Sequence, residues 1–297
     1  CMTALEFGVR ADTAEVYVPR TAAAARDENA EAPQSESVYV PAAPQNTAPV
    51  LSAADKAATL TINNDTDYEV DVAACLAEDT HIRAEGEGPQ VLVFHTHASE
   101  SYTPDAAFPY TPTEPERTTD TRYNVVRVGD ELCSALEERG IEAVHLRSLF
   151  DTPTYAGSYD RSLEAVEQAL AEYPSVKVVI DLHRDSILTD EGVAYRTSCT
   201  IDGTETAQLM FVVGTDAGGL YHPDWRENLS FASTLQYALN RAYPSLMRPL
   251  NLRTQRFDQH ASPGSLLIEV GSSGNTLPEA LSAVRLFADV LADEMTG

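Results

Sequence analysis

The sequence predicts an α/β fold in which a single mainly parallel sheet is covered by helices on both faces. Short apolar runs of strand length alternate along the chain with amphipathic stretches of helix length, the order that is typical of parallel sheets. The 297 residues are 43% apolar, which is enough for one large core. No internal repeat interrupts this order, so we expect one compact domain.

We expect this domain to span residues 56–297 and to follow an acidic tether over residues 1–55. The tether is rich in Ala, Pro, Glu, Ser and Thr and has no sustained period of 2 or 3.6 residues, which is the composition of a disordered linker. Because the sequence opens at Cys1 without Met, we expect a preceding segment, either a membrane anchor or a lipoprotein signal, and we favour the anchor.

The elements of the domain follow from periodicity. Residues 58–70 alternate around an Asn-Asn-Asp-Thr-Asp turn, which predicts a hairpin at the edge of the sheet. Gly140 ends one helix, and "TLPE" at 276–279 provides an N-cap for another. The other predicted elements are strands at 90–94, 141–146, 176–182, 196–201, 208–214 and 265–271, and helices at 124–140, 162–173, 227–243 and 277–295.

Charge and cysteine content exclude several classes of function. Asp and Glu outnumber Lys and Arg 46 to 20, for a net charge of −26, and such a chain is repelled by nucleic acid and by anionic membrane surfaces. The four cysteines show no CxxC spacing, which argues against a zinc ribbon and a redox pair. We expect free thiols at these positions: Cys1, Cys75, Cys133 and Cys199.

Histidines and carboxylates stand at the ends of three predicted strands. "VFHTHASE" carries His95, His97 and Glu100, "DLHRDS" carries His183, and "SLLIEVG" carries Glu269. Functional groups in open α/β sheets gather at the carboxyl ends of the strands, so we expect these side chains to converge. Such a set suits a catalytic zinc, which takes three protein ligands and leaves one position for water.

Several roles stay open at this level. His95 and His97 face the same way if their segment is extended, yet only one need bind the metal. Arg184 can steady a developing oxyanion and Asp185 can accept a histidine N–H, although a surface ion pair is an equal alternative for each. Glu269 is either a general base or a structural glutamate. The remaining histidines are expected to be structural, exposed or at the margin of the site: His81, His145, His222 and His260.

Four motifs in order, "VLVFHTHASESYTP", "VIDLHRDS", "ENLSFA" and "SPGSLLIEVGSSGNTLPEA", resemble the stage II sporulation protein P family, peptidoglycan amidases of endospore-forming bacteria. The resemblance runs from about residue 60 to the C-terminus. It implies a fold similar to zinc-dependent N-acetylmuramoyl-L-alanine amidases, an N-terminal membrane anchor and an extracytoplasmic location at the septal or engulfing membrane. It also implies a peptidoglycan substrate, action on stem-peptide cross-links and a partner, stage II sporulation protein D.

The resemblance assigns roles to individual residues. His97 stands at the position of the first zinc-binding histidine of the amidases. The resemblance therefore implies that His97 is a zinc ligand and that His95 is its neighbour. The second zinc ligand matches His183, and the catalytic glutamate matches Glu269.

The chain departs from the wider amidase pattern at the glutamate ligand. That glutamate opens the first helix in the amidases, whereas Asn124 stands at this place here. The resemblance then implies Glu100 as the replacement, ahead of Glu114 and Glu116. A second departure is Asp258, which stands where the family often has asparagine.

Two other functions remain alternatives. A catalytically silent wall-binding or scaffold protein would keep the fold, but it has no chemical reason to keep the histidines and Glu269. A zinc carboxypeptidase would use an HxxE-plus-His ligand set such as His97, Glu100 and His183. The reaction products distinguish an amidase, which releases intact stem peptides, from a carboxypeptidase, which releases single amino acids.

Overall fold

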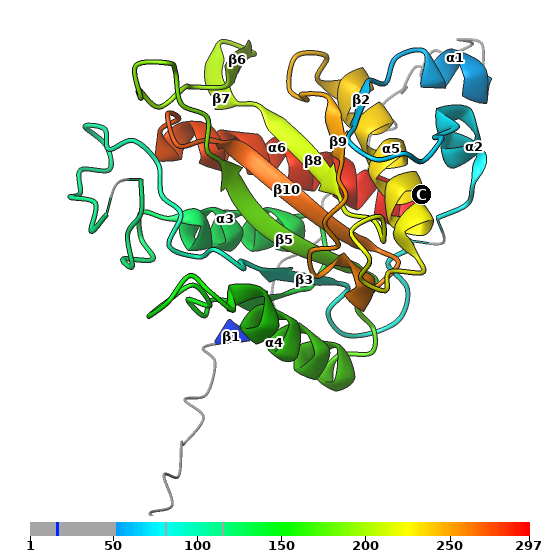
Figure 1. The fold of residues 1–297 in the computed structure, drawn as a ribbon, viewed down its shortest axis with the longest axis horizontal. Helices are drawn as coiled ribbons and strands as arrows, with labels where there is room; N and C mark the ends of the chain where they lie inside the picture. Colours follow the sequence, from blue (N-terminus) through cyan, green and yellow to red (C-terminus); the bar gives the residue numbers. More distant parts are fainter. Residues whose placement is uncertain (1–15, 18–51, 81, 115) are drawn as a thin grey trace, which may run out of the picture.

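The structure is a computed structural model that describes residues 16–17, 52–80, 82–114 and 116–297. Its centre is an eight-stranded sheet with the strand order β1-β4-β3-β5-β10-β8-β9-β2, and β6 and β7 form a separate two-stranded sheet (Figure 1). The strands are β1 (Val16–Tyr17), β2 (Ile62–Asn64), β3 (Val91–Phe94), β4 (Ala143–Leu146), β5 (Val178–Asp185), β6 (Ser198–Ile201), β7 (Thr204–Ala207), β8 (Leu209–Val213), β9 (Leu250–Leu252) and β10 (Ser265–Ser272).

The sheet is mainly parallel, as the sequence predicts. β4, β3, β5 and β10 run parallel to their neighbours, and so do β8, β9 and β2. The antiparallel pair of β10 and β8 joins these two sets, and β1 pairs antiparallel with β4 at the edge. The helices are α1 (Ala53–Ala57), α2 (Val72–Ala77), α3 (Val125–Glu138), α4 (Ser158–Glu172), α5 (Trp225–Ala242) and α6 (Leu277–Thr296), with a 3₁₀ turn η1 (Gln259–Ala261).

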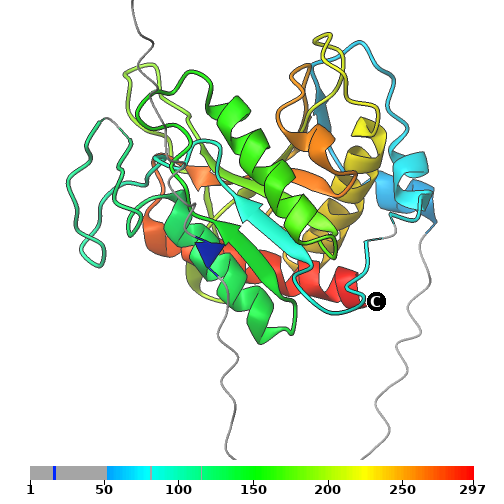
Figure 2. The same ribbon diagram turned by 90° about the horizontal axis from the view of Figure 1, so that it is seen from below.

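Helices cover the two faces of the sheet unequally. α3 and α6 lie behind the sheet in Figure 1 and below it in Figure 2, and together with α5 they enclose the main core. On the other face α4 packs Val166 and Ala169 on β3, β4 and β5. Beyond α4, the strands β8 and β10 carry only a small apolar cluster of Met210, Val212 and Leu267, against which Phe257 packs. This half of the sheet is therefore open to a ligand.

The predicted hairpin over residues 58–70 is wrong. This segment forms the single strand β2, which pairs in parallel with β9, a strand that the sequence analysis did not predict. Asn64 accepts from Thr66 N at 2.9 Å and donates to Tyr68 O at 2.8 Å, which closes a local turn. Tyr68 then stacks on Trp225 of α5 with ring centroids 5.0 Å apart, so the chain turns onto the helix instead of returning as a second strand.

Helix caps agree with the sequence. Asn124 caps α3 through its side chain, which accepts from Val126 N at 3.0 Å. Thr276 and Glu279 form the predicted capping box of α6. In the described part of the chain, no helix combines the length and the apolar character that crossing a membrane requires.

The predicted tether lies mostly outside the described residues. Within it, β1 pairs with β4, and α1 begins at Ala53 behind the capping residue Ser52. Three of the four cysteines lie among the described residues and are free thiols, as predicted: Cys75, Cys133 and Cys199.

Candidate active site

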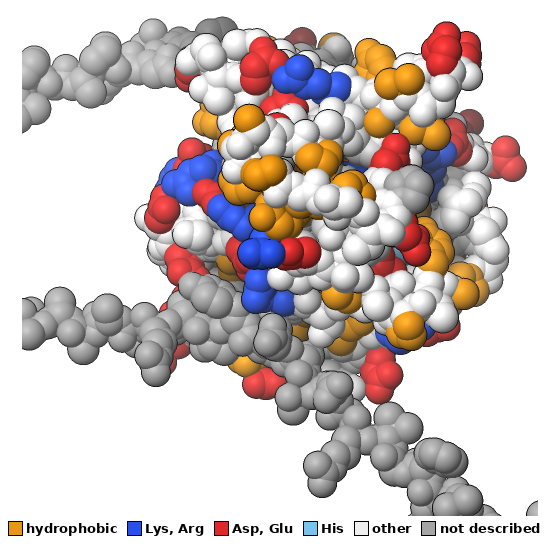
Figure 3. Space-filling view, turned by 90° about the vertical axis from the view of Figure 1, so that its left-hand side faces the viewer, with side chains coloured by type: hydrophobic (Ala, Val, Ile, Leu, Met, Phe, Trp, Pro, Cys, Tyr) orange, Lys and Arg blue, Asp and Glu red, His pale blue; other side chains and the backbone are white. Residues whose placement is uncertain are grey.

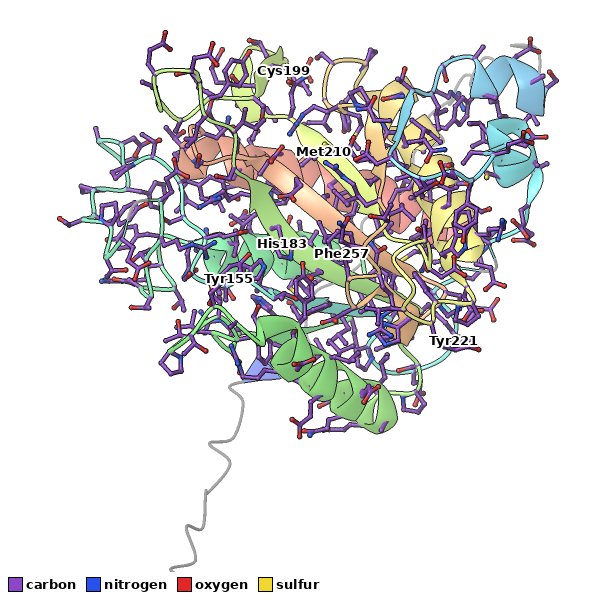
Figure 4. All side chains as sticks on the ribbon, viewed as in Figure 1. Tyr155, His183, Cys199, Met210, Tyr221 and Phe257 are labelled. Carbon is purple, nitrogen blue, oxygen red and sulfur yellow. The ribbon has the colours of Figure 1, made fainter. Side chains whose placement is uncertain are left out.

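A cleft of about 490 Å³ lies on the open half of the sheet. Its lining includes His97 and Glu100 from the turn after β3, His183 from β5 and Glu269 from β10. Figure 4 shows His183 in the middle of this face, with Phe257 beside it and Tyr155 nearer α4. Four of the five side chains that the sequence analysis selected at three strand ends therefore share one cleft, and His95 is the exception.

Glu269 and His183 are directly opposite each other on neighbouring parallel strands, so their side chains emerge on the same face. The Glu269 Oε2 atom is buried and has no hydrogen-bond partner among the described residues. Burial, reinforced by the nearby charges of Glu100 and Asp185, raises the pKa of Glu269 to about 8. A carboxyl group with such a pKa can exchange a proton near neutral pH.

His183 lies between two carboxylates. Its Nδ1 is 3.4 Å from Glu100 Oε2, and its Nε2 is 2.8 Å from Asp181 Oδ1. Burial opposes a charge on the imidazole, but Asp181 and Glu100 together hold the pKa of His183 well above its usual value. Of the two roles left open for Asp185, a histidine N–H acceptor or an ion pair, the structure shows the ion pair, with Arg248 at 2.8 Å.

Asp181 belongs to a buried polar chain that the sequence analysis missed. It accepts from Thr96 N at 2.9 Å and from Thr96 Oγ1 at 2.7 Å. Thr96 Oγ1 lies 3.0 Å from Ser162 Oγ, which donates to Asp258 at 2.6 Å. Asp181 and His183 are two positions apart on one strand, and this spacing was the available signal in the sequence.

Glu100 accepts from the backbone N of Arg184 at 3.2 Å and lies 3.7 Å from the guanidinium of Arg117. Burial disfavours its charge, but the hydrogen bond and the charge of His183 lower the pKa of Glu100 to about 2. Glu100 is therefore an anion at neutral pH, the form in which a carboxylate binds metal.

His97 is held by hydroxyl groups. Its Nε2 lies 2.8 Å from Tyr155 Oη and its Nδ1 lies 3.4 Å from Ser158 Oγ. The ring stacks on Tyr155 with centroids 4.3 Å apart and meets His183 edge to face at 5.3 Å. Burial and the neighbouring His183 lower the pKa of His97 to about 4, so the imidazole is neutral at physiological pH.

His95 does not face the same way as His97. β3 ends at Phe94 and the chain then turns, so the alternation of an extended strand does not apply. His95 Nδ1 donates to Leu182 O at 2.8 Å, and its Nε2 lies 2.7 Å from His145 Nε2. A Cβ atom at Gly129 would lie 2.6 Å from His145 Nε2 and 2.7 Å from His95 Nε2, so α3 approaches this pair closely. His95 is thus part of the core between the sheet and α3.

Arg184 lies at the cleft, but its guanidinium is engaged with backbone. Nε donates to Ser101 O at 3.0 Å and an Nη atom donates to Glu116 O at 2.6 Å. These bonds hold the segment before α3 against β5. The oxyanion role of Arg184 stays a prediction, and the structure adds this positioning role to it.

The other candidates lie outside the cleft lining. Glu116 contributes its carbonyl to Arg184, and Glu114 is exposed. His260 and His222 face each other with ring centroids 6.3 Å apart. Glu100 is thus the one of the three proposed glutamate ligands that lines the cleft beside His183.

The donors in the cleft are chemically suited to zinc. Imidazole and carboxylate are zinc ligands, and two ligands about 2.0–2.1 Å from a tetrahedral ion lie roughly 3.3 Å from each other. The 3.4 Å between His183 Nδ1 and Glu100 Oε2 matches this spacing. In the described part of the chain, however, no three such side chains meet as a metal-binding group. Both nitrogens of His97 face the hydroxyl groups of Tyr155 and Ser158. Zinc binding therefore stays a prediction.

The fold and the cleft define an α/β protein with a histidine and glutamate site on the open half of a mainly parallel sheet. The chain belongs to the Stage II sporulation protein P family, whose pattern matches residues 12–292, and the predicted family is thereby confirmed. Stage II sporulation protein P of Bacillus subtilis (strain 168) is 31% identical over 219 residues, covering 70% of this chain and 51% of the relative. The chain thus spans about half the length of that curated relative.

The solved structures that resemble the chain include two N-acetylmuramoyl-L-alanine amidases. N-acetylmuramoyl-L-alanine amidase AmiC2 of Nostoc punctiforme superimposes with a TM-score of 0.40 at 14% identity, covering 71% of this chain and 97% of that one. N-acetylmuramoyl-L-alanine amidase from Clostridium difficile 630 gives a TM-score of 0.42 at 12% identity, with coverage of 70% and 95%.

Proposed function

We propose that this chain is a zinc-dependent N-acetylmuramoyl-L-alanine amidase that hydrolyses peptidoglycan during sporulation. The observation that carries the proposal is the placement of Glu269 beside His183 in the cleft that also contains His97 and Glu100. Membership of the Stage II sporulation protein P family supports the sporulation role.

In this proposal His97, Glu100 and His183 hold the zinc. Zinc, when bound, supplies a Lewis acid that polarises the lactyl carbonyl and lowers the pKa of water to roughly 7. Glu100 is an anion and His97 is neutral at physiological pH, which are the states that bind metal, whereas His183 must release the proton that Asp181 and Glu100 stabilise before it can bind zinc. Asp181 fixes the orientation of His183 from its other nitrogen.

Glu269 is the general base and acid. It takes the proton of the attacking water and then gives it to the departing alanine nitrogen, which must be protonated to leave. The pKa of about 8 suits a group that must both accept and return a proton. Arg184 holds the segment around Ser101 and Glu116 and, as predicted from the sequence, stabilises negative charge on the carbonyl oxygen.

The setting of the reaction is part of the proposal. The chain would act outside the cytoplasmic membrane, held there by an N-terminal anchor, on septal wall. Stage II sporulation protein D would act beside it, cutting the glycan strands that the amidase exposes, and cross-link endopeptidase activity would accompany the amidase activity.

Digestion of purified sacculi with metal-analysed protein tests the proposal. Mass spectrometry should find intact stem peptides with free L-alanine amino groups. Release of single C-terminal amino acids would instead identify a carboxypeptidase. Binding of sacculi without any released product, by protein that contains zinc, would identify a silent wall-binding protein.

A further inference from the structure

We propose that a second pocket next to the cleft binds uncharged N-acetyl sugar rings of the glycan strand, so that the stem peptide lies toward the opposite, arginine-bearing end of the cleft. The pocket has a volume of about 470 Å³ and lies between α4, the loop with Leu220 and the segment 254–258. This inference rests on the proposed function, because it assigns the two arms of that substrate to two places.

The second pocket is continuous with the cleft. Tyr159, Gln255 and Phe257 line both of them. A ligand whose reacting bond lies beside His183 and Glu269 can therefore extend past Phe257 into the second pocket. A polymer with two arms at the scissile amide requires such an adjoining space.

Phe257 has a backbone conformation that side chains rarely adopt. Its φ is 53°, in the left-handed region that is unfavourable for a bulky residue. Its ring packs against Met210, Val212 and Leu267 and is 6.1 Å from the ring of Tyr159. Backbone strain of this kind clusters at ligand-binding sites, where the surrounding structure maintains it. The strain here places an aromatic ring at the boundary between the two cavities.

The lining of the second pocket suits an uncharged amphipathic ring. Tyr159, Phe257, Leu163 and Leu220 offer apolar surface, while Asp160 and Thr254 offer oxygen atoms to hydroxyl and amide groups. Leu220 is 57% exposed, so the rim presents apolar surface that a ligand can cover. Sugar rings combine apolar C–H faces with hydroxyl edges and match this arrangement.

Charge separates the two arms of the substrate. The second pocket has the carboxyl groups of Asp160 and Asp258, and its guanidinium, Arg256, donates to Tyr221 O at 3.2 Å. The other end of the cleft has Arg248 and Arg253 on the β9 side, where Arg248 pairs with Asp185 and Arg253 pairs with Asp65. Stem peptides have free carboxylates, which arginine attracts and the carboxylate of Asp160 repels. The glycan strand therefore fits the second pocket and the peptide fits the arginine end.

The test uses a short oligomer of N-acetylglucosamine, which has no peptide and no charge, and titration calorimetry. Wild type should bind it, and Leu220→Asp should weaken binding by about tenfold or more, because a charge replaces apolar contact area worth roughly 1.4 kcal/mol or more. Val193→Asp is the matched control, since Val193 is 61% exposed on another loop. Leu220→Ser, a smaller change, should move affinity in the same direction if Leu220→Asp alters folding.

A free anionic stem tripeptide provides the second arm of the test. Its affinity should fall in Arg253→Gln and stay unchanged in Leu220→Asp. Equal oligosaccharide binding by wild type and both Leu220 variants, or an equal loss in Val193→Asp, would overturn the proposal. Stem-peptide release from sacculi by protein that does not bind the oligosaccharide would overturn it too and leave the amidase function intact. A different outcome is that wild type releases no peptide from sacculi but binds the oligosaccharide, and the Leu220 variants lose this binding. That outcome would support the sugar site and exclude the amidase function.

Discussion

His95 and His97 are two positions apart, yet they lie in opposite surroundings. His95 is in the core between the sheet and α3, where its nitrogens meet Leu182 O and His145. His97 is in the cleft, where its nitrogens meet the hydroxyl groups of Tyr155 and Ser158. Hydroxyl groups rotate and can give up a contact, whereas a carbonyl in a strand cannot. The comparison shows that His97 is the histidine free to bind a ligand, because its hydroxyl partners can be replaced.

The largest expected effect tests the chemistry of the cleft. Glu269→Gln should keep the fold and bind zinc, while hydrolysis of sacculi falls by roughly 10²- to 10⁴-fold, because glutamine cannot transfer a proton. Stem-peptide release by zinc-loaded wild type and variant measures this. Glu164→Gln, on the exposed side of α4, is the control, and a Glu269→Gln rate above a tenth of wild type would remove Glu269 from the mechanism.

The next prediction separates the two histidines. His97→Ala and His183→Ala should each lose zinc, since two remaining protein ligands make a weak site. His95→Ala should keep zinc and lose about 10- to 100-fold in activity, the usual cost of a change behind the ligands. Metal content of the three purified variants measures this. If His95→Ala lost the metal and His97→Ala kept it, the assignment of the two histidines would have to be exchanged.

A third, smaller effect concerns the core around His95, where α3 packs against the sheet. Gly129→Ala places a Cβ atom against the ring nitrogens of His95 and His145, so the free energy of unfolding should fall by about 1–3 kcal/mol. Zinc content should stay at the wild-type value, because the cleft lies on the other face of the sheet. Urea unfolding of Gly129→Ala and of the exposed control Ser134→Ala measures the difference. Unchanged stability of Gly129→Ala would show that α3 can move away from the histidine pair.

The last predicted effect is a pH dependence of stability, with no change expected in the chemistry of the cleft. Burial raises the pKa of Asp258 to about 7, from 3.8 for an exposed aspartate. The folded state keeps a proton on Asp258 that the unfolded state releases, and this proton binding stabilises the folded state. The stabilisation is complete below about pH 4 and is lost as pH rises to about 7. Asp258→Asn should remove this dependence, and the stability of wild type relative to the variant should fall by on the order of 3–4 kcal/mol between pH 4 and pH 8.

Thermal or urea unfolding at several pH values measures the Asp258 effect. A difference between wild type and Asp258→Asn that is the same at pH 4 and pH 8 would show that Asp258 ionises normally in the folded chain.

The sequence predicted the parts of this protein that follow from periodicity. Helices α3, α4, α5 and α6 and strands β3, β4, β5, β8 and β10 were found because long amphipathic stretches and apolar runs determine their own type. β2 and β9 were misread or missed because three residues are too few to show a period. Their pairing depends on contacts between segments far apart in the chain.

The candidate site divides in the same way. His97, Glu100, His183 and Glu269 follow or end apolar runs, and position alone selected them. Tyr155 is on a loop, and nothing in its neighbourhood in the sequence predicts that it will reach His97. The orientation of His95 depended on where β3 ends, and strand ends are the least certain feature of a sequence-based prediction.

The position of Glu269 in β10 has a consequence for motion. β10 is flanked by β5 and β8, and its residues are nearly all buried. Amide hydrogens in such a central strand exchange with solvent only when the whole domain opens, whereas a loop residue such as Tyr155, 57% exposed, belongs to a segment that opens locally. We therefore expect the amides of β10 around Glu269 to exchange more slowly than those around Tyr155, whose hydroxyl meets His97.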